Sequence, residues 1–220
     1  MTRLGLLGFG IATAGCGNGA ASDPAVDRPL ICEPTATGFE GPYFLDTGVL
    51  RQDITEDRLG RPLELDIQVV EADRDCEPVA GARVEVWHAD ADGAYSAYDE
   101  RDGNLVDAAD RTFLRGAQDT DRAGRVTFST IFPGWYPGRT THIHAKIRFD
   151  GIELLTTQIY FDQDVNDEIF ATDLYASRGP QATSNERDFL LRSDVDPFFE
   201  VEDSGGILLA SAVIGLTELY

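Results

Sequence analysis

The sequence predicts an all-β fold, a β-sandwich of mainly antiparallel strands with long functional loops. Three observations support this prediction. Short segments alternate apolar and polar residues, turn-forming residues separate them, and no long amphipathic helical pattern is present. Several short strands joined by turns are typical of two packed sheets.

Alternation of side-chain character identifies the first three strands. Leu63–Val69 alternates aliphatic residues with acidic or amide residues, as a strand with one buried face does. Arg83–Trp87 repeats the pattern with two valines. Arg125–Ile131 follows an Asp-Arg-Ala-Gly turn at 121–124.

Two further strands, Thr141–Phe149 and Leu154–Phe161, are expected to form a hairpin, because an Asp-Gly pair between them favours a tight turn. A final apolar run, Ile207–Leu216, is expected to be a buried strand.

The remaining segments carry weaker signals. The best helical candidate is the short segment Asn185–Arg192. Two long segments, Asp99–Asp119 and Asp162–Ala182, show no regular pattern and are expected to be irregular loops. Loops of that length in a compact domain are usually functional.

The N-terminus has the features of an export signal. Residues 1–16 carry Arg3 before an apolar run that is too short to cross a bilayer. The stretch that ends at Cys16 resembles a bacterial lipobox, so three outcomes stay open: lipidation at Cys16, ordinary cleavage near Ala20 or Ala21, and retention of the leader. Residues 17–30 are expected to be a flexible linker, and residues 31–220 a single domain. The protein is therefore expected to be exported, either free outside the cytoplasm or anchored by lipid at the cell surface.

Two cysteines remain once Cys16 is lipidated or removed. In an oxidising compartment Cys32 and Cys76 are predicted to form a disulfide, with two buried free thiols as the alternative.

The charge balance limits the partners. The net charge is −21, and Lys146 is the only lysine among 18 basic residues. Nucleic acids and anionic membrane surfaces need clustered positive charge, so neither is expected to bind, and membrane contact is expected only through a lipid anchor.

Two of the chain's three histidines, His142 and His144, lie close to Tyr136 and Arg139. Alternation along a strand sends both imidazoles to one face and the intervening apolar side chains to the other. The sequence therefore indicates a metal site backed by an apolar core.

Further motifs support a family assignment. A tyrosine follows a strand end and a glycine turn in Val84–Ser96, and ordered motifs follow at Phe113–Gly116, Thr120–Asp121, Phe132–Tyr136, Gly138–His144 and Thr157–Phe161. Together they resemble the intradiol ring-cleavage dioxygenases, the family of catechol, hydroxyquinol and protocatechuate dioxygenases, and are most similar to its exported single-domain members. The resemblance covers residues 40–161.

This resemblance implies a non-haem Fe(III) ion held by four ligands, Tyr95, Tyr136, His142 and His144. It also implies that a small aromatic diol and O2 are the substrates, and that the ring opens between the two hydroxyls to give a muconate. Substrate would displace Tyr136, which would take up a substrate proton. The helical dimerisation region of the intracellular catechol enzymes has no counterpart here, so a homodimer stays open.

By the same resemblance, Arg139 stabilises negative charge on the substrate and Gln158 orients oxygen intermediates. That role requires Gln158 to lie opposite His144. A two-residue hairpin turn would place it opposite Ile143, so we predict a three-residue loop, 150–152. Tyr43 and Trp135 are predicted to line the substrate pocket, because an aromatic wall suits a flat ring.

Two other interpretations remain. A pair of histidines can bind zinc or ferrous iron with a third histidine, cysteine or carboxylate. Alternatively, the chain is an exported transthyretin-like binding module without dioxygenase activity. The third histidine, His88, is expected to make a structural hydrogen bond rather than to bind metal.

Overall fold

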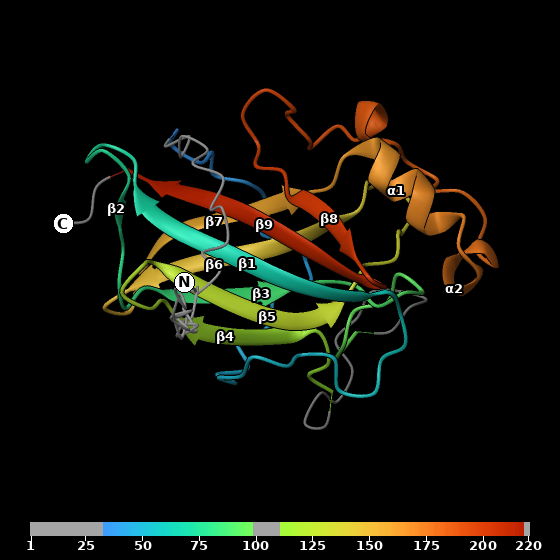
Figure 1. Ribbon diagram of the computed structural model, residues 1–220, viewed down its shortest axis with the longest axis horizontal. Helices are drawn as coiled ribbons and strands as arrows, with labels where there is room; N and C mark the ends of the chain where they lie inside the picture. Colours follow the sequence, from blue (N-terminus) through green and yellow to red (C-terminus); the bar gives the residue numbers. More distant parts are fainter. Residues whose placement is uncertain (1–32, 99–110, 218–220) are drawn as a thin grey trace, which may run out of the picture.

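A computed structural model describes residues 33–98 and 111–217, and it is a sandwich of two sheets (Figure 1). The five-stranded sheet has the order β2-β1-β9-β8, with β5 also paired to β1. Its strands are β1 (Pro62–Glu71), β2 (Glu77–Pro78), β5 (Arg125–Ile131), β8 (Glu200–Ser204) and β9 (Ile207–Leu216). The four-stranded sheet has the order β4-β3-β6-β7. Its strands are β3 (Arg83–Trp87), β4 (Arg115–Asp119), β6 (His142–Phe149) and β7 (Ile152–Tyr160).

The predicted all-β sandwich of mainly antiparallel strands is confirmed. Every strand pair is antiparallel except β1 with β9, which is parallel. All six predicted strands are present, with ends that shift by a few residues.

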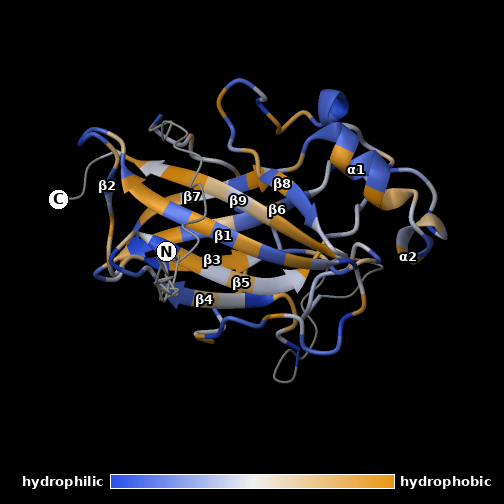
Figure 2. Cartoon of the chain, viewed as in Figure 1, coloured by the Kyte–Doolittle hydropathy of each residue, from blue (hydrophilic) through white to orange (hydrophobic). Residues whose placement is uncertain are grey.

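The hydrophobic core lies between the two sheets. Alternate residues of β1 and β6 point into it, and Figure 2 shows the resulting alternation of apolar and polar residues along β1. These inward residues include Leu65 and Ile67 from β1 and Ile143 and Ala145 from β6, each at most 1% exposed. The residues between them on β6, including both histidines, therefore lie on the outer face of the four-stranded sheet.

Both segments expected to be irregular contain regular structure. The last part of Asp99–Asp119 is strand β4, and Asp162–Ala182 contains α1 (Gln163–Phe170) and α2 (Asp173–Ala176). Strand β4 lacks an alternating pattern because both of its faces are covered at its start, so that its arginine, glycine and alanine are all buried. The two helices are too short for a clear helical period.

The predicted helix over Asn185–Arg192 is wrong beyond its first turn. Only the 3-10 turn η1 (Asn185–Arg187) forms, and the backbone is already extended at Asp188. The reason is tertiary, because the Asp188 carboxylate accepts hydrogen bonds from Arg139 and from the backbone N–H of Thr140.

The β6–β7 hairpin corrects one prediction and confirms another. Phe149 pairs with Ile152, so the turn contains two residues, Asp150 and Gly151, and not the predicted three. Both have positive φ, as a tight hairpin turn requires. Gln158 nevertheless pairs with His144 as predicted, because a β-bulge in β7 supplies the extra residue.

A stretch of chain before β1, residues 36–51, crosses the outer face of the four-stranded sheet. We call it the covering segment. The Gly38 N–H bonds to the carbonyl of Thr156 on β7, and Leu50 pairs with Ala117 on β4. Side chains on this outer face are thereby buried although they lie outside the sandwich core.

The predicted leader (1–16) and linker (17–30) lie outside the described residues, as do Cys32 and residues 99–110. Cys76 is disulfide-bonded, and its pairing with Cys32 stays a prediction. Within the described residues, no helix combines the length and the apolar character needed to cross a membrane.

Candidate metal centre

The two histidines of β6 converge as predicted. The Nε2 atoms of His142 and His144 lie 3.1 Å apart, and both side chains are at most 2% exposed. The Nδ1 atom of His142 lies 2.7 Å from the carbonyl oxygen of Thr140. Since a carbonyl only accepts, Nδ1 carries the proton and the Nε2 of a neutral His142 presents a lone pair toward His144.

Two tyrosines complete the cluster. The Tyr136 hydroxyl, from the loop after β5, lies 3.1 Å from the Nε2 of His142. The Tyr95 ring, from the loop after β3, lies edge-on to Tyr136 at 5.7 Å and to His144 at 6.1 Å between ring centroids. Its buried hydroxyl has no hydrogen-bond partner within the described structure. Four side chains from three separate segments thus meet at one place.

The two loops that carry these tyrosines are packed backbone against backbone. The Gly134 N–H donates to the carbonyl of Asp90 at 2.9 Å. A Cβ at Gly134 would collide with the carbonyl of Ala91, and a Cβ at Gly93, where φ is +82°, would collide with that of Trp135. Glycine at both positions therefore allows the loops to approach closely enough to bring the tyrosines together.

Burial keeps all four groups uncharged in the protein alone. It is the main reason that the pKa of His142 is lowered to about 3, with a smaller contribution from Arg139, and that the pKa of His144 is well below its ordinary value. Burial also raises the pKa of Tyr95 well above 10, and it raises that of Tyr136 against the opposing charge of Arg139. Neutral imidazoles are the form that binds metals, and a highly charged cation can remove the phenolic protons.

This donor set fits a hard trivalent cation. Two phenolates and two neutral imidazoles would offset most of a 3+ charge in a buried place where net charge is costly. The unpartnered Tyr95 hydroxyl supports that fit, because a buried phenol normally has a partner. In the described part of the chain no cluster of three or more His, Cys, Asp and Glu side chains is arranged to hold a metal ion. The Tyr136 hydroxyl, 3.1 Å from the Nε2 of His142, is an additional donor beside the histidines.

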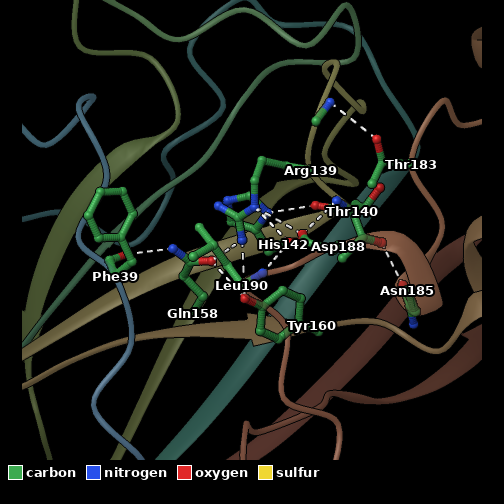
Figure 3. Close-up of polar contacts among 12 residues, drawn as sticks. Phe39, Arg139, Thr140, His142, Gln158, Tyr160, Thr183, Asn185, Asp188 and Leu190 are labelled. Carbon is green, nitrogen blue, oxygen red and sulfur yellow. Dashed lines mark hydrogen bonds and ion pairs between the residues drawn. The ribbon is translucent and has the colours of Figure 1, made fainter.

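Arg139 and Gln158 meet beside this cluster (Figure 3). The Arg139 Nη2 donates to the Gln158 side-chain oxygen and, at 3.2 Å, to the Tyr160 hydroxyl. Its Nε donates to the Asp188 carboxylate at 2.9 Å. The Gln158 amide in turn donates to the carbonyl of Phe39 in the covering segment. The guanidinium is therefore fixed from three sides.

The covering segment closes the cluster from above the sheet. Tyr43 stacks on Tyr95 with ring centroids 4.5 Å apart and lies edge-on to Tyr136 at 6.2 Å. Gly41 faces His144, since a Cβ there would lie 3.3 Å from the His144 Cε1. Trp135 lies differently, with its ring 4.5 Å from the guanidinium carbon of Arg178 and against the sandwich core, so its part in substrate binding stays a prediction.

A cavity of about 610 Å³ borders the cluster on the side of Tyr95 and Tyr98. Neither histidine lines it, nor does Tyr136, so it adjoins the cluster without containing it. Its other lining residues are Glu56, Asp57, Arg58, Asp90, Ala94, Arg111 and Phe113.

His88 makes the structural hydrogen bonds expected of it. Its ring nitrogens lie 2.8 Å from the carbonyl of Ala89 and 2.8 Å from the hydroxyl of Thr130.

Sequence reasoning missed three residues of the site. Tyr160 shares the face of Gln158 by strand alternation, so that pattern could have identified it. Gly41 and Asp188 had no comparable signal, because each meets its partner only through the fold.

The fold and the cluster define a β-sandwich protein with two tyrosines and two histidines arranged as a candidate metal centre, and comparisons with known proteins place it more narrowly. The model of a family described as dioxygenase matches residues 39–192. An intradiol ring-cleavage dioxygenase from Tetranychus urticae is 31% identical, with a TM-score of 0.79 over 86% of this chain and 97% of that one. The chain belongs to the intradiol ring-cleavage dioxygenase family.

Other relatives agree with this assignment. The dioxygenase domain of a dioxygenase carbohydrate-binding protein fusion from Streptomyces sp. SirexAA-E is 30% identical, with a TM-score of 0.63 over 85% of this chain and all of that domain. A chlorocatechol 1,2-dioxygenase from Pseudomonas putida is 34% identical over 58% of this chain and 54% of its own length. The chain thus spans about half the length of the curated relatives that it matches.

Proposed function

We propose that this protein is an enzyme that cleaves the ring of a catechol-type diol between its two hydroxyl-bearing carbons, using O2 and one non-haem Fe(III) ion to give a muconate-type product. One observation carries the proposal. The Nε2 atom of His142 lies 3.1 Å from the Nε2 atom of His144 and 3.1 Å from the hydroxyl of Tyr136, and the unpartnered hydroxyl of Tyr95 belongs to the same cluster. These four residues would hold the ion.

A ferric ion held there would supply a Lewis acid that binds both oxygens of a catechol and an electron acceptor that makes the ring reactive toward O2. The protein has to provide a charge-balanced site and a place for the catechol protons. Two phenolates and a diol dianion cannot all be accommodated, because net negative charge in a buried site is costly. One phenolate is therefore expected to leave as a neutral phenol when the diol enters.

Tyr136 is the candidate for this step. It is only half-buried, whereas Tyr95 is 5% exposed and stacked beneath Tyr43. Burial raises the pKa of the Tyr136 phenol, so the released side chain would keep one of the two protons that the diol loses, and the other would leave to solvent. Tyr95 is enclosed and would stay in place.

Arg139 is positioned to stabilise negative charge that develops on the ring oxygens. Its guanidinium is fixed by Gln158, Tyr160 and Asp188, and a preorganised cation in a dry site stabilises charge without first having to reorient. Gln158 is held between Arg139 and the covering segment, which fits a role in orienting oxygen intermediates.

Oxygen uptake with a panel of catechols would test this function. The iron-loaded wild type should consume O2 and show a visible absorption band from tyrosinate-to-iron charge transfer. Tyr136→Phe should keep the fold and lose most turnover. A colourless protein that binds zinc and consumes no O2 would instead support a non-catalytic metal-binding module, and equal turnover in both proteins would exclude the role given to Tyr136.

We also propose that the protein is exported, as the leader predicts. The disulfide at Cys76 supports this, because disulfides persist in oxidising compartments. Fractionation of expressing cells, with mass spectrometry of the mature N-terminus, would test export and lipidation together.

A further inference from the structure

Lys146 is the only lysine of the chain, yet its side chain is just 3% exposed. It follows His142 and His144 on the outer face of β6, so it points into the covering segment. A buried ammonium needs partners, and Lys146 has three. Its Nζ bonds to the Glu40 carboxylate, lies 3.0 Å from that of Glu153, and sits 3.9 Å from the centre of the Phe44 ring.

Two of these partners are the ends of one short loop, residues 40–44, which we call the site-covering loop. Glu40 begins the loop, and Phe44 ends it and packs on Trp87 at 5.0 Å. The residues between them contact the metal centre. Gly41 faces His144, and Tyr43 stacks on Tyr95 and meets the edge of Tyr136.

Lys146 therefore contacts both ends of the site-covering loop, and the middle of this loop contacts three of the four proposed ligands. We propose that Lys146 is a positioning residue that holds the site-covering loop over the metal centre through Glu40 and Phe44, and so sets the space in which the aromatic diol binds. Its effect on the diol rests on the proposed function, whereas its hold on the loop does not.

The third partner provides a matched control. Glu153 belongs to β7, the neighbouring strand, so its contact with Lys146 stays within the sheet and does not reach the loop. Glu40 and Glu153 have similar side-chain exposure, 44% and 47%. Loss of either carboxylate removes one ion pair from the same ammonium, but only loss of Glu40 frees the loop.

Hydrogen exchange measured by mass spectrometry on the metal-free protein tests the hold directly. In Lys146→Met and Glu40→Gln, the peptide that contains residues 38–44, in which the Gly38 N–H donates to the carbonyl of Thr156 on β7, should exchange at least tenfold faster than in the wild type. In Glu153→Gln its exchange should change less than twofold, and the amides of β1 should be unchanged in every variant. Lys146→Arg, which keeps the charge, should restore most of the protection.

The single lysine allows a second readout. An amine-directed reagent followed by mass spectrometry reports on Lys146 and the N-terminus alone, and Lys146 should label faster in Glu40→Gln than in the wild type. In the iron-loaded enzyme, Lys146→Met should raise KM for catechol at least fivefold and change kcat less than twofold. The same variant should also shift the visible band, which a purely structural role would leave in place.

If Lys146→Met folds and its site-covering loop exchanges hydrogen at the same rate as in the wild type, the proposal is overturned. If Lys146→Met does not fold, the Glu40→Gln variant tests the proposal instead. The Glu40 side chain is 44% exposed, and removing its charge leaves Lys146 in place. A wild type that turns over no catechol, but whose loop exchange responds as described, would refute the proposed function and leave the role of Lys146 standing.

Discussion

Gln158 lies directly opposite His144 across β6 and β7, although the turn that joins these strands contains only two residues. Arg148 pairs with Glu153 and Ile147 with Leu155, so Leu154 has no partner and forms the bulge. The apolar residues of β7, such as Leu155 and Ile159, must face the core. After a two-residue turn, β7 has one residue too many for this register, and the bulge takes up that residue. The position of Gln158 is therefore set by burial on the opposite face of its strand.

Deletion of Leu154 should consequently preserve the site. Without the bulge, a two-residue turn still pairs Leu155 with Ile147 and Gln158 with His144. We expect the deletion variant to lose about 1 to 2 kcal/mol of stability from the partly buried leucine and, when loaded with iron, to keep the visible band that the proposed ferric tyrosinate site would give.

An alanine inserted after Thr156 is the matched control, because it would turn Gln158 into the core and Ile159 outward. It should cost more than about 3 kcal/mol in the free energy of unfolding, measured by urea denaturation, and abolish the band. Equal losses in the two variants would show that the bulge itself is required.

The sequence predicted the strands well because burial of one face leaves a two-residue period, as in β1 and β6. It did not predict β4, whose Arg115 is buried by contacts that include Ser96, a residue far away in sequence. The grouping of the two histidines with Tyr136 could be predicted from the sequence because all three lie within nine residues of one another. The contact between Arg139 and Asp188 joins residues 49 positions apart, and no local pattern encodes it.

Asp188→Asn tests the buried ion pair that fixes Arg139. The side chain of Asp188 is fully buried and that of Arg139 is 10% exposed, so the variant leaves a buried guanidinium without its counter-charge. We expect a loss on the order of 3 kcal/mol in the free energy of unfolding and at least a tenfold lower kcat.

The comparison is Asp66→Asn, which removes a partner of Arg125 from a pair with both side chains at least 40% exposed. That variant should lose less than about 1 kcal/mol and keep full activity. A similar small loss in both variants would mean that the contact between Asp188 and Arg139 does not stabilise the fold more than an exposed ion pair does.

Burial of His88 should make the protein less stable as the pH falls from 6.5 to about 4. Burial lowers the pKa of His88 from 6.5 to about 4. Between these values the unfolded chain binds more protons than the folded one, so acidification favours unfolding by up to about 1.4 kcal/mol per pH unit. This contribution is fully present above pH 6.5 and is lost as the pH falls toward 4.

Urea denaturation of the metal-free protein at several pH values should therefore give a steeper dependence for wild type than for His88→Gln. Glutamine can keep a hydrogen bond to Thr130 without titrating. Parallel slopes for the two proteins across pH 4 to 6.5 would contradict the assignment of a neutral buried His88.

The disulfide at Cys76 is predicted to join Cys32, which would tie the chain ahead of the covering segment to the five-stranded sheet. Peptide mapping without reductant should recover these two cysteines in one linked fragment. Reduction should lower the free energy of unfolding by about 2 to 5 kcal/mol. A fragment that links Cys76 to Cys16 would disprove the pairing and exclude lipidation of Cys16.

Gly41→Ala tests the approach of the covering segment to His144. The backbone at Gly41 has a φ of +77°, and the added Cβ would lie 3.3 Å from the His144 Cε1. Gly48→Ala is the matched control, since its φ is +60° but nothing lies within 4 Å of the added Cβ. Both variants should lose about 1 kcal/mol of stability from the positive φ. Only Gly41→Ala should also raise KM for catechol and shift the visible band, because only there does the methyl group press on a proposed ligand. Identical kinetics in the two variants would mean that the backbone at Gly41 does not shape the site.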